Sequence, residues 1–327
     1  MFLFLFLFCK FNHFSIYLYR QNLNLLIMFG LRPDGKQVRD IDPIQRIIPH
    51  IMRHRHDSQN LTDYDCPCEP LDAFIKGQSA LGENYNYMHI VIAGLVRTIA
   101  LFPRINRFIM NGRIFQRNTI QISFVVKKGL SAEAADTTVK IDFTGLESLP
   151  EVRDKINDAI RANSHMDANN GTDKLARLIT FTPNFLIHFL VATIKYLDKH
   201  GLLPGAILKV SPFHTSAFIT NLKSIKGPSI FHHLYDFGNT GMFFAMGKEA
   251  KVPVIEGDQV VVGKRMPLYI VTDERFCDGF YFVNALRNLR ENYAHPERLL
   301  ERLEKVSQDV KVIDRHSFRK KNRNKDE

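Results

Sequence analysis

The feature that most constrains this chain is an apolar run that leads through an acid-rich turn into an amphipathic stretch. Residues 268–271 read Leu-Tyr-Ile-Val, residues 272–279 read Thr-Asp-Glu-Arg-Phe-Cys-Asp-Gly, and apolar side chains then recur from Phe280 to Leu289 at helical spacing. The pattern predicts a strand that delivers a short turn directly into a helix. Turns at the end of a strand commonly present catalytic or binding groups. Residues 272–279 are therefore the first candidate for a functional site.

Length and composition indicate one soluble globular domain. The chain has 327 residues, of which 45% are hydrophobic and 24% charged, which is large for one domain but short for two independent enzymes. Cys66 and Cys68 lie too close together for a zinc hook, and no second cysteine pair answers them. We therefore expect free thiols, no bound metal and a reducing, cytoplasmic location.

The net charge of +10 favours anionic partners, but part of it lies in the basic segment 315–325. Because residues 306–327 lack apolar periodicity, we predict a disordered tail there. The sequence has no helix-turn-helix signature and no alternation of aromatic and basic residues, so we expect no nucleic-acid partner. A polyphosphate such as that of coenzyme A is compatible with the excess of positive charge.

Two apolar segments raise the question of a membrane. Residues 1–27 begin with a Phe/Leu run that lacks the features of a secretory signal, and we expect a dispensable extension before a domain that starts at residue 28; an interfacial anchor is the alternative. Residues 178–194 contain no charged residue but include Pro183, Asn184 and His188. We predict a buried helix from Pro183 to Gly201 rather than a transmembrane span.

The remaining pattern alternates helices and strands without the regular repeat of a doubly wound sheet. We predict helices at 42–56, 86–102 and 147–162, a hairpin at Asn111-Gly112, and strands at 120–127, 139–143, 216–222, 241–247 and 267–272. A closing helix from Asp278 should bury Phe280, Val283, Leu286 and Leu289. The expected fold is an α/β (α+β) sandwich with a mixed sheet, formed by a single domain over residues 28–305 with a helical insertion at 163–212.

Three segments together resemble the catalytic domain of 2-oxo acid dehydrogenase acyltransferases, which has the chloramphenicol acetyltransferase-like fold. Residues 102–106 (Phe-Pro-Arg-Ile-Asn) and 111–114 (Asn-Gly-Arg-Ile) are similar to the family's P-x-x-N turn and hairpin. Residues 217–222 (Ala-Phe-Ile-Thr-Asn-Leu) are similar to its F-T-I-S-N-L strand. Residues 273–279 match its D-H-R-x-x-D-G motif except that Glu274 stands in the position of the histidine. The likeness covers about residues 40–300.

The resemblance implies a coenzyme A-dependent acyltransferase that works as a homotrimer with its active sites between subunits. In the family the histidine is the general base toward a thiol, a strand hydroxyl stabilises the oxyanion, and the motif Asp forms a structural ion pair. These roles map to Glu274, Thr220 and Asp278, with Gly279 retained. The resemblance also implies acyl-CoA as substrate. No lipoyl attachment is expected in this chain.

Glu274 leaves three hypotheses open. A carboxylate with an ordinary pKa near 4.3 matches a thiol near 8.5 less well than an imidazole near 6.5 does, and lost general-base catalysis typically costs about 10²–10⁴-fold. Glu274 is then a working base in a divergent enzyme, or a polar residue in a non-catalytic homotrimeric binding or assembly module. In the third hypothesis another histidine is the base, with His232 and His233 the first candidates and His214 the next.

Overall fold

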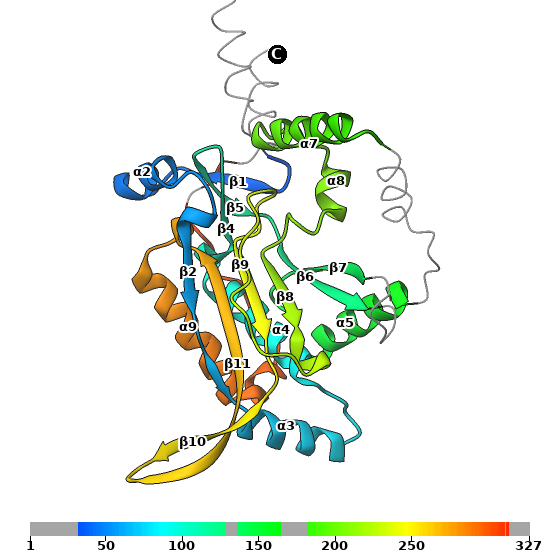
Figure 1. Ribbon diagram of the computed structural model, residues 1–327. Helices are drawn as coiled ribbons and strands as arrows, with labels where there is room; N and C mark the ends of the chain where they lie inside the picture. The colour runs from blue at the N-terminus through cyan, green and yellow to red at the C-terminus, as the bar shows by residue number, and fades with distance from the viewer. Residues whose placement is uncertain (1–31, 128–135, 165–181, 311, 314–327) are drawn as a thin grey trace, which may run out of the picture.

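The computed structural model describes residues 32–127, 136–164, 182–310 and 312–313 (Figure 1). The strands are β1 (Gly35–Val38), β2 (Gln59–Thr62), β3 (Asp65–Pro67), β4 (Arg107–Met110), β5 (Arg113–Arg117), β6 (Ile120–Lys127), β7 (Asp136–Phe143), β8 (Ala217–Asn221), β9 (Met242–Met246), β10 (Ala250–Glu256), β11 (Gln259–Asp273) and β12 (Val312–Ile313). The helices are α2 (Pro43–Ile51), α3 (Glu69–Ala80), α4 (Tyr87–Leu101), α5 (Leu149–Ser164), α7 (Asn184–Lys199), α8 (Gly205–Val210) and α9 (Gly279–Ala294). Short 3₁₀ turns are η1 (His56–Ser58), η2 (Pro103–Asn106), η3 (Leu222–Ile225), η4 (Glu274–Phe276) and η5 (Pro296–Leu299).

The predicted mixed sheet is confirmed. Its strands run in the order β10-β11-β9-β8-β6-β7, with β2 and β3 also paired to β11. Strand β8 lies parallel to both β6 and β9, whereas β11 is antiparallel to β9. A second, four-stranded sheet has the order β12-β1-β5-β4. The long strand β11 therefore carries the segment 272–279 to one end of the main sheet.

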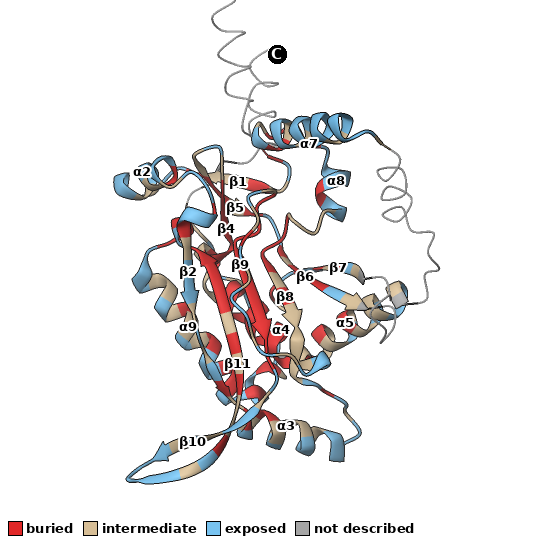
Figure 2. Ribbon diagram, in the orientation of Figure 1, coloured by how far each residue is buried: buried red, intermediate tan, exposed pale blue. Residues whose placement is uncertain are grey.

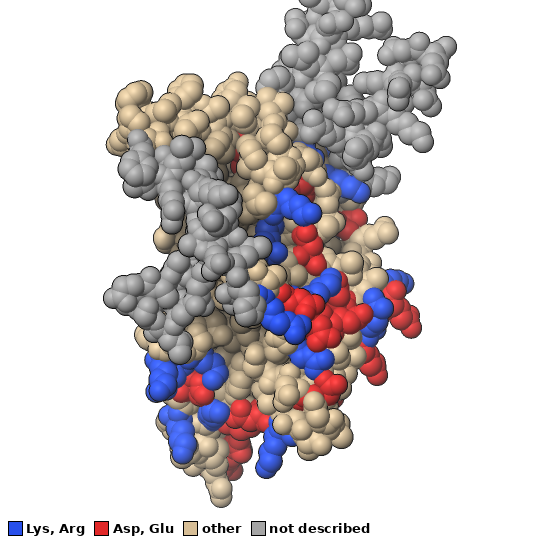
Figure 3. All heavy atoms as spheres, turned by 90° about the vertical axis from the view of Figure 1, so that its right-hand side faces the viewer, with Lys and Arg blue, Asp and Glu red and all other residues tan. Residues whose placement is uncertain are grey.

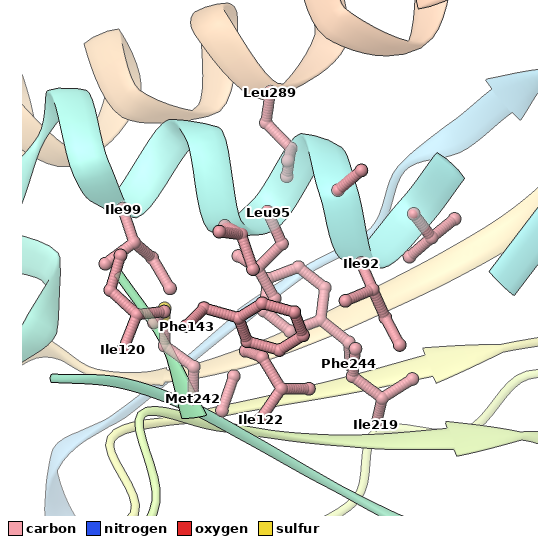
Figure 4. Packing of buried hydrophobic residues seen from close by; sticks show 14 of the residues in the cluster. Ile92, Leu95, Ile99, Ile120, Ile122, Phe143, Ile219, Met242, Phe244 and Leu289 are labelled. Atoms are coloured by element: carbon pink, nitrogen blue, oxygen red, sulfur yellow. The ribbon is translucent and has the colours of Figure 1, made fainter. Parts of the chain in front are cut away.

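One face of the main sheet packs on helices and forms the core. Apolar residues of α4 point toward the sheet, where they meet side chains from β6, β7, β8 and β9, and Leu289 of α9 covers α4 from the other side (Figure 4). Phe143, Ile219 and Phe244 are each at most 2% exposed. Because alternate strand residues point to opposite faces, this packing turns the side chains of Phe218, Thr220 and their partners to the other face.

A loop covers part of that other face. The loop between η3 and β9 stacks Phe231 on Tyr269 and His232 on Phe243, with ring centroids 4.4 and 3.9 Å apart. Leu234 is buried with Phe243 and Val271 in a small second cluster. This face is thus lined by aromatic side chains of the chain itself.

The sequence located most of the elements that build the sheet. The hairpin between β4 and β5 turns at Asn111 and Gly112, whose φ angles of 52° and 69° suit a type I′ turn. Helices α2, α4, α5 and α9, and strands β6, β7, β8 and β9, lie where the pattern predicted them. Helix α3 and strands β1, β2, β3 and β10 were not predicted.

Helix α7 forms as predicted, but the prediction that it is buried is wrong. Phe185 is 76% exposed and Phe189 66%, and most of α7 is coloured as exposed in Figure 2. In Figure 3 the surface at the height of α7 shows almost no charged atoms, whereas charges of both signs mix over the lower half. The helix is anchored by Asp198, whose carboxylate bonds to buried Arg32 and His214. Within the described residues no helix is long and apolar enough to cross a membrane.

Two further expectations, one about burial in α9 and one about the start of the tail, are also wrong. In α9, Leu289 is buried as predicted, but Phe280 is 80% and Val283 44% exposed because they face away from α4. The tail was predicted to begin at 306, but residues beyond this point belong to the fold. Asp309 forms a buried ion pair with Arg107 at 2.6 Å, and β12 pairs with β1. Residues 1–31 and 314–327, and so most of both predicted end segments, lie outside the described residues, as does Cys9. Cys66, Cys68 and Cys277 are free thiols, as expected, and all three are buried.

The buried His89 at the start of α4 makes the free energy of unfolding depend on pH. Asn86 caps the helix, and its backbone N–H donates to Nδ1 of His89, while Nε2 of His89 lies 3.2 Å from Oδ1 of Asn157. The contact at Nδ1, which accepts from the Asn86 N–H, requires the neutral ring, whereas Nε2 donates to Asn157. Burial lowers the pKa of His89 to about 4 from an unfolded value of 6.5, and the nearby Arg153 charge acts in the same direction.

We expect the free energy of unfolding to fall by about 3 kcal/mol through His89 as the pH is lowered from 6.5 to 4. In that window the unfolded chain binds the proton more readily than the folded one, so acidification favours unfolding. Urea unfolding of wild type and His89→Gln at a series of pH values measures the difference. The exposed His295→Gln serves as a control that should keep the wild-type slope, and equal slopes for His89→Gln and wild type would contradict the assignment.

Candidate active site

The charged residues of the acid-rich turn differ in burial. Asp273, the last residue of β11, accepts hydrogen bonds from Nε and Nη2 of Arg275 at 2.7 and 2.6 Å, and both side chains are 2% exposed. Asp273 also accepts from the backbone N–H of Arg275, which closes the 3₁₀ turn η4. Because Asp273 and Arg275 pair inward, the intervening Glu274 is turned outward. Arg275 is therefore not a partner for Glu274.

Glu274 stands at the rim of a cavity of about 320 Å³. Thr272, Phe276 and Asp278 line one side of it, and Ile48 and Met52 from the end of α2 line another. Glu274 is exposed, and within the described part of the chain its carboxylate has no ion pair or hydrogen bond. A carboxylate in this position is open to a ligand or to a second protein surface.

Asp278 and Gly279 begin the closing helix. The Asp278 carboxylate accepts from the backbone N–H of Tyr281 at 2.8 Å and so caps α9. It also lies 3.9 Å from Arg104, in a pair whose side chains are 47% and 36% exposed, so that this ion pair contributes little to stability. A Cβ added at Gly279 would meet no atom within 4 Å, so the chain's own packing does not require glycine there.

Thr220 lies far from Glu274 within one chain. The sheet register places Thr220 beside Ala245 of β9, which is paired in turn with Tyr269 of β11. From Tyr269 to Asp273 the strand rises about 13 Å, and two strand spacings add about 10 Å across the sheet. The Thr220 hydroxyl has no hydrogen-bond partner among the described residues. A single chain therefore does not bring Thr220 and Glu274 together.

His232 is the histidine that lies nearest to Thr220 in the sheet register. It stacks on Phe243, which is paired with Phe218, two residues before Thr220 and on the same face. Its Nδ1 lies 2.9 Å from the carbonyl oxygen of His233, so Nδ1 carries the proton and Nε2 keeps a lone pair. Burial lowers the pKa of His232. In that tautomer Nε2 of His232 offers an acceptor that has no hydrogen-bond partner within the part of the chain that is described.

The other two candidate histidines are placed less favourably. His233 is exposed and stacks on His232 at 4.9 Å. His214 is buried, with Nε2 3.0 Å from Asp198 and Nδ1 2.7 Å from the hydroxyl of Ser211. Both ring nitrogens of His214 are therefore engaged in structural contacts, which removes it as an acceptor for a substrate proton.

A larger cavity of about 660 Å³ was not predicted from the sequence. It lies between α2, the β4–β5 turn, the end of α7 and the loop before β9, and Arg275 borders it. Arg53, Lys195 and Lys199 line it and have no ion-pair partner among the described residues, whereas the lining carboxylates of Asp198 and Asp236 are already engaged. Its positive excess suits an anionic ligand. No short motif joins these residues, because they come from separate segments.

Comparison with known proteins identifies the fold. No protein-family model and no curated protein sequence matches this chain. A probable dihydrolipoamide acetyltransferase from Listeria monocytogenes matches in structure with a TM-score of 0.50 and 14% identity, over 81% of this chain and 96% of that one. The chain has the fold of that acyltransferase. A dihydrolipoamide acetyltransferase from Azotobacter vinelandii (TM-score 0.49, 14% identity, 80% and 94% covered) and a chloramphenicol acetyltransferase (0.48, 11%, 79% and 98%) are also similar.

The acyltransferase fold confirms the resemblance read from the sequence. The three segments that carried it lie on defined elements of the fold. The first covers the end of α4, η2 and the β4–β5 hairpin, the second is strand β8, and the third runs from β11 through η4 into α9. At 14% identity the likeness concerns the fold and leaves activity to be argued from the residues of this chain.

Proposed function

We propose that this chain is an acyltransferase-type protein that binds acyl-CoA and acts as a homotrimer, with slow transfer of the acyl group to a thiol or another acceptor. The observation that carries the proposal is the placement of Thr220 and Glu274. Each presents a polar group that has no partner among the described residues, and they lie too far apart to act within one chain. In the proposed trimer the Thr220 of one copy and the Glu274 of another flank the same acyl group.

The proposed reaction needs few groups. The acceptor thiol passes its proton to Glu274, and its sulfur bonds to the thioester carbonyl carbon. The Thr220 hydroxyl donates to the resulting oxyanion. The carbon–sulfur bond to coenzyme A then breaks, and the departing thiolate takes the proton from Glu274. Because an exposed carboxylate is a weak acceptor for a thiol proton, we expect this first step to limit the rate.

The positive cavity supports coenzyme A as the acyl carrier. It borders Arg275, whereas the smaller cavity borders Glu274, so the two cavities lie on either side of the turn η4. Phosphate groups in the larger cavity would face Arg53, Lys195 and Lys199, with the thioester directed toward Glu274. A cytoplasmic location, where acyl-CoA and the free thiols of this chain are both maintained, belongs to the same proposal.

We expect Thr220→Ala to lower the rate of acyl transfer by about 10²–10³-fold, because it removes the oxyanion donor. Glu274→Gln should lower it by a smaller factor, because a carboxylate is already a weak acceptor for a thiol proton, whereas His232→Asn should leave it near wild type. Loss of thioester absorbance from acetyl-CoA and longer acyl-CoAs, offered with a dithiol acceptor, measures each rate. If His232→Asn abolishes turnover and Glu274→Gln does not, the base is His232, whose ring stacks on Phe243.

The second candidate function is a non-catalytic homotrimeric binding or assembly module. This alternative is favoured by Glu274, because the side chain is exposed and its carboxylate is a weak acceptor for a thiol proton. Coenzyme A binding by calorimetry without turnover by wild type would establish this alternative. Absence of both binding and turnover would overturn the acyltransferase proposal itself.

The trimer is expected to form through apolar surface that the single chain leaves open. On α2, Ile47 is 55% and Ile51 72% exposed, and neighbouring Ile48 and Met52 line the Glu274 cavity. We therefore expect light scattering at micromolar concentration to give three times the chain mass, and Ile51→Asp to give monomer. Leu81→Asp is the matched control, since Leu81 is 76% exposed at the end of α3, at the opposite end of the molecule (Figure 1). A monomeric wild type would contradict the prediction.

A further inference from the structure

Two histidines and a carboxylate from segments far apart in the sequence meet at the surface. His54 follows α2, His56 begins η1, and Asp236 lies in the loop before β9. Nδ1 of His56 lies 3.2 Å from Oδ2 of Asp236, and Nδ1 of His54 lies 3.5 Å from the same carboxylate. One ligand atom from each of the three residues lies within 4.8 Å of the others.

These separations suit a tetrahedral metal ion. Ligand atoms at about 2.0–2.1 Å from Zn²⁺ lie roughly 3.4 Å from one another, which is close to both histidine–carboxylate distances. The side chains of His54, His56 and Asp236 are 59%, 64% and 42% exposed. Small rotations of the two rings can therefore bring their Nδ1 atoms to the same separation, and an ion can enter from solvent. The cavity of about 660 Å³ is lined by His54 and Asp236, which leaves a fourth coordination position for water or an anion.

A buried arginine fixes the backbone that carries the two histidines. The backbone N–H of Arg55 donates to Oδ1 of Asp236 at 2.8 Å, and its guanidinium donates to the carbonyl oxygens of Tyr235, Asp236 and Ile109. Arg55 thereby attaches the segment His-Arg-His to the loop of Asp236. Its charge is directed inward toward Asp273, at 3.9 Å, and away from the surface site.

A second carboxylate orients His56. Nε2 of His56 lies 2.8 Å from Oδ1 of Asp57, so this nitrogen holds the proton and Nδ1 presents its lone pair toward Asp236. A carboxylate on the far nitrogen of a ligating histidine is the usual support of a metal-bound imidazole. Simple surface pairing of a histidine with an acid would not require two acids on opposite ring nitrogens.

We propose that His54, His56 and Asp236 bind a divalent transition-metal ion of the zinc type, with Asp57 as the positioning residue. Imidazole nitrogens select such ions over Mg²⁺ and Ca²⁺, which prefer oxygen ligands. The site borders the same cavity as the proposed coenzyme A phosphates, but Zn²⁺ binding by these residues requires no acyl transfer.

Zinc binding by the full chain, stripped of metal with a chelator, tests the site. We expect one Zn²⁺ per chain in competition with a chromophoric chelator, a higher thermal midpoint in the presence of Zn²⁺, and a Co²⁺ visible spectrum of low coordination number. His54→Ala and His56→Ala should each weaken binding at least tenfold, and Asp57→Asn about 10–100-fold. Both histidines are exposed, so these variants should fold, which circular dichroism checks.

His295→Ala is the matched control. His295 is also an exposed histidine near a carboxylate, with Nδ1 3.4 Å from Glu297, but no second histidine joins it within the described residues. Its loss should not change Zn²⁺ affinity. Equal affinities for wild type, His54→Ala and His56→Ala, or binding of Mg²⁺ as tight as that of Zn²⁺, would overturn the proposal.

Discussion

Replacing Asp273 with alanine is expected to lower the free energy of unfolding by about 3–5 kcal/mol. The substitution leaves two buried cations without their carboxylate, since Arg275 is bonded to Asp273 through two nitrogens and Arg55 lies 3.9 Å away. Burial already lowers the pKa of Arg55 to about 10, and the charge of Asp273 opposes that shift. Breaking a buried pair costs more than the pair contributes, because the remaining charge stays desolvated. Urea unfolding of the purified chains measures the loss.

The adjacent Glu274→Ala provides the matched control. It removes the same functional group one residue away, but from an exposed side chain with no partner among the described residues. Its free energy of unfolding should lie within about 0.5 kcal/mol of wild type. Similar losses for the two substitutions would show that the buried network around Asp273 does not hold the turn as described.

The sequence predicted the turns and helix ends that are determined by the chemistry of one or two neighbouring residues. Asn111-Gly112 requires left-handed backbone that few other pairs tolerate, and Asp278 has the side chain that caps a helix, so the β4–β5 hairpin and the start of α9 could be placed from residues alone. The mixed sheet followed from apolar runs of strand length. These features depend on neighbours within a few positions along the chain.

Burial of amphipathic helices could not be predicted in the same way. The apolar stripes on α2 and α7 have the spacing of core helices, yet Ile51 and Phe185 are 72% and 76% exposed. Periodicity shows that a helix has an apolar face, but not whether that face meets its own domain or another surface. The same limit applies to Phe280, whose helical phase in α9 points away from α4.

Contacts between segments that are far apart in the chain could not be predicted from the sequence either. The meeting of His54 and His56 with Asp236 depends on Arg55, whose buried guanidinium bonds to carbonyl oxygens in two other segments. An Arg between two histidines gives no local sign that it is buried. The positive cavity beside Arg275 is assembled in the same manner from separate elements.

Glu274→His is expected to raise the rate of acyl transfer by about 10²–10⁴-fold over wild type. Glu274 stands at the end of β11 on a turn held by the Asp273–Arg275 pair, and neither partner contacts position 274 through its side chain. A histidine can therefore replace it without disturbing the buried network. An imidazole near pKa 6.5 accepts a thiol proton more readily than a carboxylate near 4.3 by about two pKa units, or roughly 3 kcal/mol of driving force.

The double variant Glu274→His with Thr220→Ala separates a gain at this site from any other effect. If the new histidine acts with the strand hydroxyl of another copy, the double variant should lose most of the gain, because the oxyanion donor is absent. Mixing the double variant with wild-type chains should then restore part of the gain, since only a site shared between copies can combine the histidine of one chain with the Thr220 of another. A gain that persists in the double variant would mean that Thr220 and position 274 do not share a site, and a rate unchanged by Glu274→His would exclude position 274 as the base.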